Sequence, residues 1–144
     1  MILIQSWQEA EIPAFAVRQK VFIQEQGVPE DLELDEFDSG ATHALAIEGS
    51  QCIGTGRLVS AGGLQGQIGR MAVLSAFRNT GIGRAILERL IEHARSAGME
   101  SLILHSQVTA IPFYEKHGFQ SQGDIYDEAG IPHRNMILLL QKLS

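Results

Sequence analysis

The sequence predicts an α/β fold of the α+β kind, in which helices flank a mixed, mostly antiparallel central sheet. Two runs of strand type at residues 43–48 and 52–60 are joined by Gly49-Ser50, which is typical of an antiparallel hairpin. A strand, an amphipathic helix and a buried strand follow between residues 67 and 106, and two strands connected through a helix run parallel. The C-terminal segment again has the apolar runs of strands.

The composition indicates one ordinary globular domain, residues 1–144, because no repeat, low-complexity segment or linker divides the chain. A net charge of −6 argues against a nucleic-acid partner. No apolar run approaches the ~18 residues that a membrane span needs, so no membrane partner is expected. The single Cys52 rules out an internal disulfide, and the absence of an export signal favours the cytoplasm.

The N-terminal elements are a short strand at residues 2–4 and a helix that extends to Gln26. Ser6 and Glu9 have the spacing of a capping box. Pro13, however, favours a start of the regular helix near itself, with the proline in the first turn.

An acidic segment follows, with six carboxylates between Glu30 and Asp38. Two interpretations stay open. The segment is a solvated loop, or it forms the rim of a cleft and attracts a cationic amine by its negative charge.

The remaining elements follow from apolar periodicity and from the glycines that end them. They are a strand at 67–74, a helix from 82 to Gly98, a strand at 101–106, a helix at 109–117, a strand from 119, a turn at 127–130 and a last strand at 135–140.

The turn between the strand at 67–74 and the following helix contains Gly81 and Gly83. The first N–H groups of a helix have no partner within the helix, so a glycine turn at this place is suited to hold a phosphate. A dinucleotide fingerprint would need a third glycine where Ile86 stands, and a P-loop would need Gly-Lys-Ser/Thr instead of Gly83-Arg84-Ala85. What remains is Arg-x-x-Gly-x-Gly, which alone fits an anion site and a tightly packed helix start equally well.

A second motif lies after the next strand, where residues 113–119 read Phe-Tyr-Glu-Lys-His-Gly-Phe. In this order and spacing, the two motifs resemble the GCN5-related N-acetyltransferase (GNAT) superfamily, and the resemblance covers nearly the whole chain. Residues 17–29 and 130–136 are similar to the YjcF/ElaA-like branch of small bacterial acetyltransferases.

The resemblance implies a GNAT-like acyl-CoA acyltransferase fold in which the strands at 67–74 and 101–106 splay apart and hold the pantetheine arm between them. It implies acetyl-CoA as co-substrate and no metal. Many relatives have Asn, whose side chain contacts the cofactor, where this chain has Gln107, which carries the same amide on a longer side chain. The cofactor-binding residues that it implies are Met71, Ala72, Val73, Arg78, Asn79, Thr80, Gly81, Ile82, Gly83, Arg84, Gln107 and Phe113.

Tyr114 occupies the position of the general acid in the family, and a phenol is protonated at neutral pH. The other interpretation of Tyr114 is a core aromatic whose hydroxyl bonds the backbone. The general base is open between His105, His133, an acidic residue and water.

The function expected from this resemblance is the transfer of acetyl from acetyl-CoA to a primary amine of a small molecule or peptide, by direct attack. The expected partners are that acceptor and a second copy of the chain in a homodimer. The alternative is a non-catalytic acyl-CoA-binding or sensor module, and a structural interaction domain would not need the glycine turn.

Overall fold

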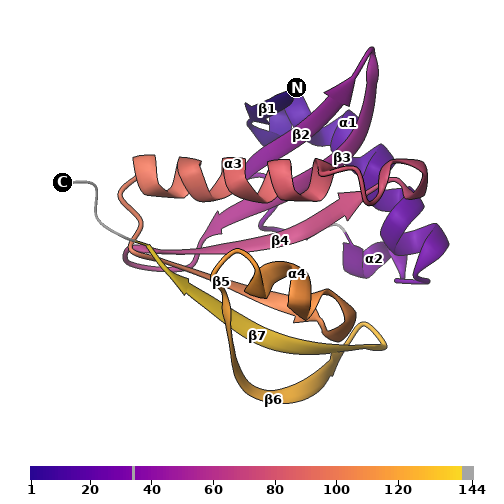
Figure 1. Ribbon diagram of the computed structural model, residues 1–144. Coiled ribbons are helices and arrows are strands. Elements are labelled where there is room, and N and C mark those ends of the chain that lie inside the picture. Colours follow the sequence, from indigo (N-terminus) through magenta and orange to yellow (C-terminus); the bar gives the residue numbers. More distant parts are fainter. Residues whose placement is uncertain (34, 141–144) are drawn as a thin grey trace.

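The computed structural model describes residues 1–33 and 35–140, which form one seven-stranded sheet with helices on both faces (Figure 1). The strands are β1 (Ile2–Gln5), β2 (Thr42–Glu48), β3 (Gln51–Ser60), β4 (Gln65–Val73), β5 (Ser101–Gln107), β6 (Gln120–Glu128) and β7 (Ile131–Leu139). The helices are α1 (Trp7–Arg18), the π-helical η1 (Gln19–Glu25), α2 (Glu30–Glu33), α3 (Ile82–Ser96) and α4 (Ile111–Glu115), with 3₁₀ turns η2 (Ser75–Phe77) and η3 (Val108–Ala110).

The strand order in the sheet is β1-β2-β3-β4-β5-β7-β6. The β4–β5 pair is parallel and the other neighbouring pairs are antiparallel, so the predicted mixed, mostly antiparallel sheet is confirmed. The β2–β3 hairpin closes with Glu48 opposite Gln51, as predicted. No helix within the described ranges is long and apolar enough to cross a membrane.

The start of the first helix differs from the prediction, because α1 begins at Trp7 and carries Pro13 in its interior. The carbonyl of Ser6 accepts the backbone N–H of Ala10 at 2.9 Å, and its hydroxyl bonds the Glu9 carboxylate at 3.3 Å. A proline inside a helix removes one hydrogen bond at a cost of about 3 kcal/mol. Burial of Ala10, Ala14 and Val17 against the sheet offsets this cost.

Three further boundaries differ from the sequence prediction. The last strand begins at Ile131 instead of 135, because its polar first half pairs with β5 on one side and β6 on the other. The α-helix predicted at 109–117 is limited to Ile111–Glu115 and is preceded by the turn η3. The predicted acidic loop contains the short helix α2.

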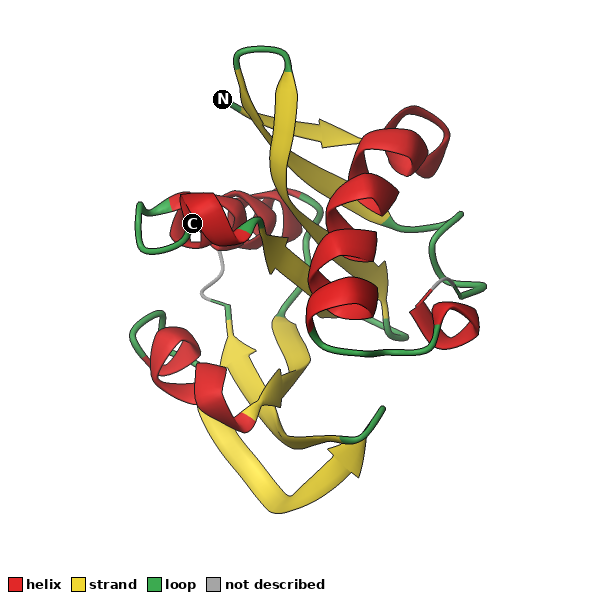
Figure 2. Ribbon diagram, turned by 90° about the vertical axis from the view of Figure 1, so that its right-hand side faces the viewer, coloured by secondary structure: helices red, strands yellow, loops and turns green. Residues whose placement is uncertain are grey.

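The core consists of two layers on opposite faces of the sheet, because successive side chains of a strand alternate between the faces. On β2, Ala44 and Ala46 belong to the apolar cluster that includes α3, and Leu45 belongs to the cluster of Ala10 and Ala14 on α1. Figure 2 shows α1 and α3 on these two faces. The layers fix the sheet from both sides.

The two parallel strands separate toward their C-terminal ends, as Figure 1 shows. Pairing runs from Gln65 opposite Ser101 to Ile68 opposite Leu104 and goes no further. On its other side β4 has a bulge, where Arg70 has a φ of +51° and the register with β3 shifts. A bulge bends the strand that carries it. The bulge therefore turns the second half of β4 away from β5 and confirms the predicted splay.

Candidate active site

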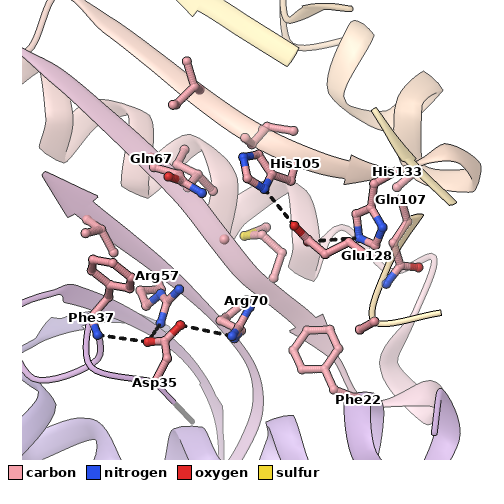
Figure 3. A pocket seen from close by; sticks show the side chains of 18 of the residues that line it. Phe22, Asp35, Phe37, Arg57, Gln67, Arg70, His105, Gln107, Glu128 and His133 are labelled. Atoms are coloured by element: carbon pink, nitrogen blue, oxygen red, sulfur yellow. Dashed lines mark hydrogen bonds and ion pairs between the residues drawn. The ribbon is translucent and has the colours of Figure 1, made fainter. Parts of the chain in front are cut away.

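A pocket of about 900 Å³ opens where β4 and β5 separate. Its walls come from β3, β4, β5, β7, α4 and the segment between α1 and β2, so residues distant in the sequence meet in it (Figure 3). The side chains of Phe22, Val28 and Ile103 form part of its apolar lining. The polar lining divides into a histidine–carboxylate group and an arginine–carboxylate group.

Tyr114 lines this pocket from α4, and its side chain is buried. The rings of Phe113 and Phe119 pack edge-on against it, with centroid distances of 5.1 and 5.8 Å. Burial raises the pKa of Tyr114 to about 12. Within residues 1–33 and 35–140, no hydrogen bond to its hydroxyl is present, so the structure gives no support to a hydroxyl tied to the backbone. Tyr114 thus presents a protonated phenol to the pocket.

Glu128 lies between the two histidines that the sequence proposed as candidate bases (Figure 3). One oxygen is 3.0 Å from Nδ1 of His105, and the other is 3.6 Å from Nε2 of His133. Nδ1 of His133 lies 2.7 Å from the carbonyl oxygen of Ile131. Because a carbonyl only accepts, Nδ1 of His133 carries the proton, and its Nε2 is the nitrogen that faces Glu128.

Sequence reasoning placed Glu128 only in a predicted turn. The hairpin register, which pairs Glu128 with Ile131 and Gln107 with His133, brings the carboxylate beside both histidines. Residues 131 and 133 lie on the same face of β7, because side chains alternate along a strand. Glu128 is paired with Ile131, so a prediction that started this strand at residue 131 could have placed Glu128 near His133.

The acidic segment is not a solvated loop, because two of its carboxylates are buried in ion pairs. Arg18 donates from Nε to Glu33 at 2.5 Å and from Nη1 to Asp38 at 2.8 Å, and all three side chains are almost completely buried. Burial alone would raise the pKa of Asp38, but the hydrogen bonds and charge of Arg18 outweigh it and hold that pKa below its usual value.

Asp35 continues this network to the surface of the pocket. Its Oδ1 accepts from Nη1 of Arg57 at 2.7 Å and from the backbone N–H of Phe37 at 3.0 Å. Its Oδ2 accepts from Nη2 of Arg70 at 3.2 Å. Figure 3 shows the Asp35 carboxylate between the two guanidinium groups. One carboxylate therefore joins an arginine of β3 to the arginine at the bulge of β4.

The glycine turn lies on the α3 side of the splayed strands. Asn79 and Gly81 have left-handed φ values of +62° and +86°, and the hydrogen bonding of α3 begins with Ala85 N–H donating to the Gly81 carbonyl at 3.0 Å. The N–H groups before Ala85 are the unpaired donors of a helix start. Backbone amides in such a turn form a concave anion site. The geometry fits a phosphate group.

A family model described as an acetyltransferase (GNAT) domain matches residues 6–140. The chain belongs to this family. It is 38% identical over 126 residues to YjcF of Bacillus subtilis, an uncharacterized N-acetyltransferase, covering 86% of this chain and 89% of YjcF.

Two solved structures support the assignment to the GNAT family. An acyl-CoA N-acyltransferase from Pseudomonas aeruginosa superposes with a TM-score of 0.86 at 25% identity, covering 95% of this chain and 97% of that one. ElaA of Escherichia coli superposes with a TM-score of 0.82 at 25% identity, covering 95% and 99%. The GNAT acyltransferase fold and the predicted resemblance to the YjcF/ElaA-like branch are therefore confirmed.

In this GNAT chain, Arg78 and Arg84 were predicted to bind the pyrophosphate, but in the structure each of them forms an ion pair with a glutamate. Arg78 forms a two-point ion pair with Glu25 at 2.6 and 2.7 Å, and its Nε donates to the Val73 carbonyl at 3.0 Å. Arg84 pairs with Glu88 one turn later on α3 at 2.9 Å. Val73 was predicted to contact the cofactor, and its carbonyl accepts this bond from Arg78. A phosphate contact of either arginine requires an exchange of partners.

The other predicted cofactor residues of the GNAT site surround the splay. Met71 and Gln107 line the pocket, and the Gln107 amide exchanges hydrogen bonds with that of Gln26 at 2.9 and 3.5 Å. Ala72 is buried. Phe113 lies against Gly83, since a Cβ built on that glycine would be 3.7 Å from its ring. Thr80 and Ile82 complete the turn before and at the start of α3.

Proposed function

We propose that the chain is an acetyl-CoA-dependent N-acetyltransferase that transfers acetyl to a primary amine of a small molecule or peptide by direct attack. The observation that supports this proposal best is that Tyr114 and Glu128 line one pocket, at the splay of β4 and β5. One group donates a proton and the other accepts one. Family membership supports acyl transfer in general.

Acetyl-CoA supplies a thioester, whose C–S bond breaks as the C–N bond of the product amide forms. In this exchange the amine loses one proton and the sulfur gains one. A catalyst of the reaction therefore needs an acceptor on the amine side and a donor on the sulfur side, which are the roles that we assign to Glu128 and Tyr114.

Glu128 accepts the proton of the amine, either directly or through a water molecule. His105 Nδ1 on β5 lies 3.0 Å from one of its oxygens, within hydrogen-bond distance, and this contact gives the carboxylate a fixed place in the pocket; His133 Nε2 on β7 lies 3.6 Å from the other oxygen, beyond hydrogen-bond distance. The Nδ1–H···O bond of His133 to Ile131 directs its Nε2 toward Glu128. His105 acts as the positioning residue for this carboxylate, and His133 lines the pocket beside it.

Tyr114 serves the sulfur. The phenol of Tyr114 has a pKa of about 12, whereas an ordinary thiol has a pKa of about 8.5, so the phenol is the weaker acid of the two. The same burial raises the pKa of a thiol held beside it and narrows the difference. Tyr114 therefore stabilises the negative charge on sulfur by donating a hydrogen bond as the C–S bond breaks, and its proton moves to sulfur only where burial brings the pKa of the thiol close to that of the phenol.

The turn before α3 and the splayed strands hold acetyl-CoA. The N–H groups of residues 79–84 bind its pyrophosphate, the backbone of residues 71–73 faces the pantetheine arm, and Gln107 supplies a side-chain amide nearby. Arg78 and Arg84 add positive charge beside the phosphates by exchanging Glu25 and Glu88 for them. The N–H groups left free at the start of α3 fit this role.

The test is a titration with acetyl-CoA, followed by an assay of thiol release across a panel of primary amines. Binding together with amine-dependent thiol release is expected. Binding without release across a broad panel would favour a non-catalytic acyl-CoA-binding module, and absence of binding would overturn both functions.

A further inference from the structure

Arg57 has a hydrogen-bonding group that no residue in the described part of the chain uses. Its side chain is 8% exposed, lines the pocket from β3 and donates from Nη1 to Asp35 at 2.7 Å and to Asp38 at 3.0 Å. Its Nε–H is buried, and within the described residues it has no hydrogen-bond partner. A buried donor without a partner costs free energy, so the Nε side of this guanidinium is suited to receive an acceptor.

The carboxylates around Arg57 are already satisfied. Both oxygens of Asp35 accept from arginines, and Oδ1 also accepts a backbone N–H. Both oxygens of Asp38 accept from Arg18. Glu33 accepts from Arg18, and its other oxygen lies 3.4 Å from Arg70. The charges of Arg18, Arg57 and Arg70 are matched by these three carboxylates, which are not free to bind a cationic amine, and what this end of the pocket still offers is the Nε–H donor of Arg57.

The pocket thus has two polar ends with opposite chemistry. Arg57 and Arg70 lie at one end, and Glu128 with its two histidines lies at the other (Figure 3). The apolar side chains of Phe22 and Val59 contribute to the wall. An acceptor that fits both ends carries an amine at one position and an anion at another.

We propose that the acceptor is an amino acid, whose carboxylate binds the Nε side of Arg57 beside Arg70 while its amine is presented to Glu128. A planar guanidinium holds a carboxylate through two parallel N–H···O bonds, so Arg57 selects for the acid as well as orienting it. This inference rests on the proposed acetyl transfer, and it specifies that the amine acceptor of that reaction is an amino acid. It replaces the expectation that the acidic segment attracts a simple cationic amine.

The first test compares matched acceptors on the wild-type protein. Phenylalanine is compared with 2-phenylethylamine, and 5-aminopentanoate with pentylamine, by kcat/KM per neutral amine. In at least one pair, the carboxylate should raise kcat/KM by about 10- to 100-fold. Equal or lower kcat/KM for the acid in both pairs overturns the inference and leaves the N-acetyltransferase function in place. Acetyl-CoA binding without thiol release from any amine overturns the proposed function itself.

The second test uses Arg57→Lys, which keeps the positive charge and removes the guanidinium fork. The acid-to-amine ratio of kcat/KM should fall by about tenfold or more. Arg95→Gln on the exposed side of α3 is the control for loss of an arginine and should keep the wild-type ratio. An unchanged ratio in a folded Arg57→Lys protein, with wild-type acetyl-CoA affinity, overturns the assignment to Arg57. If this variant does not fold, the matched acceptors on the wild-type protein decide.

Discussion

His133 Nε2 lies 3.6 Å from a carboxylate oxygen of Glu128, and the His133 ring is oriented by the 2.7 Å bond of its Nδ1–H to the Ile131 carbonyl. The hairpin of β6 and β7 fixes both contacts, because residues 128 and 131 are paired partners in it. Glu128 is therefore held by backbone geometry as well as by side chains. This arrangement makes it the best-defined candidate base in the pocket.

Glu128→Gln should lower kcat by about 10²-fold, because the amide cannot accept the amine's proton. The dissociation constant of acetyl-CoA should stay near the wild-type value, since Glu128 lies away from the turn that we assign to the pyrophosphate. Steady-state thiol release and a binding titration measure the two quantities. Asp127→Asn, which changes the exposed neighbour of Glu128, is the matched control. A wild-type kcat in Glu128→Gln would assign the base to another group.

Tyr114→Phe should lower kcat by about 10²-fold or more with little change in acetyl-CoA affinity, because only the hydroxyl is lost. The pKa of about 12 gives a second expectation. The phenol stays protonated through the usual assay range, so Tyr114 should cause no loss of kcat between pH 7 and pH 10. The pH profile of kcat in the two proteins checks both points, and an unchanged rate in Tyr114→Phe would remove the hydroxyl from the mechanism.

Asp38→Asn should destabilise the fold by about 3 kcal/mol, because it removes the negative charge that compensates the buried Arg18. The folded-state pKa of Asp38 lies below its unfolded value, so its stabilisation is present above pH 4 and is lost as the pH falls through the folded pKa. Urea unfolding at pH 7 and below pH 4 measures the free energy of unfolding of the wild-type protein and of Asp38→Asn. The difference between these two free energies should be smaller at the lower pH. Glu36→Gln, an exposed acid in the same segment, is the control, and an equal loss in it would contradict the buried network.

The sequence predicted the order of the elements because periodicity and glycines are local signals. The hairpin at Gly49, the helix from Ile82 and the parallel pair β4–β5 all follow from them. Pro13 was misleading, since burial of one face of α1 outweighs a local preference. The homodimer predicted from the sequence stays a prediction.

The site was predictable where it depends on a motif and not where it depends on distant contacts. Tyr114 and the turn at Gly81 came from motifs with fixed spacing. The role of Glu128 depends on a hairpin register, and that of Arg57 on two carboxylates, 19 and 22 residues before it in the chain. Pairings of this kind leave no periodic pattern, so the sequence left the segment of six carboxylates open between a solvated loop and the rim of a cleft, and neither interpretation included its buried ion pairs.

Gly81→Ala should weaken acetyl-CoA binding about tenfold, because the left-handed φ of +86° costs an L residue about 1–2 kcal/mol and disturbs the N–H groups before α3. A Cβ at Gly81 would contact nothing within 4 Å, so crowding is not the cause. Gly49→Ala is a matched control, since Gly49 also has a positive φ (+62°) with nothing within 4 Å, and it lies in the β2–β3 turn. Both variants should lose similar thermal stability, and only Gly81→Ala should raise the dissociation constant of acetyl-CoA. Equal affinities in the two variants would place the pyrophosphate away from this turn.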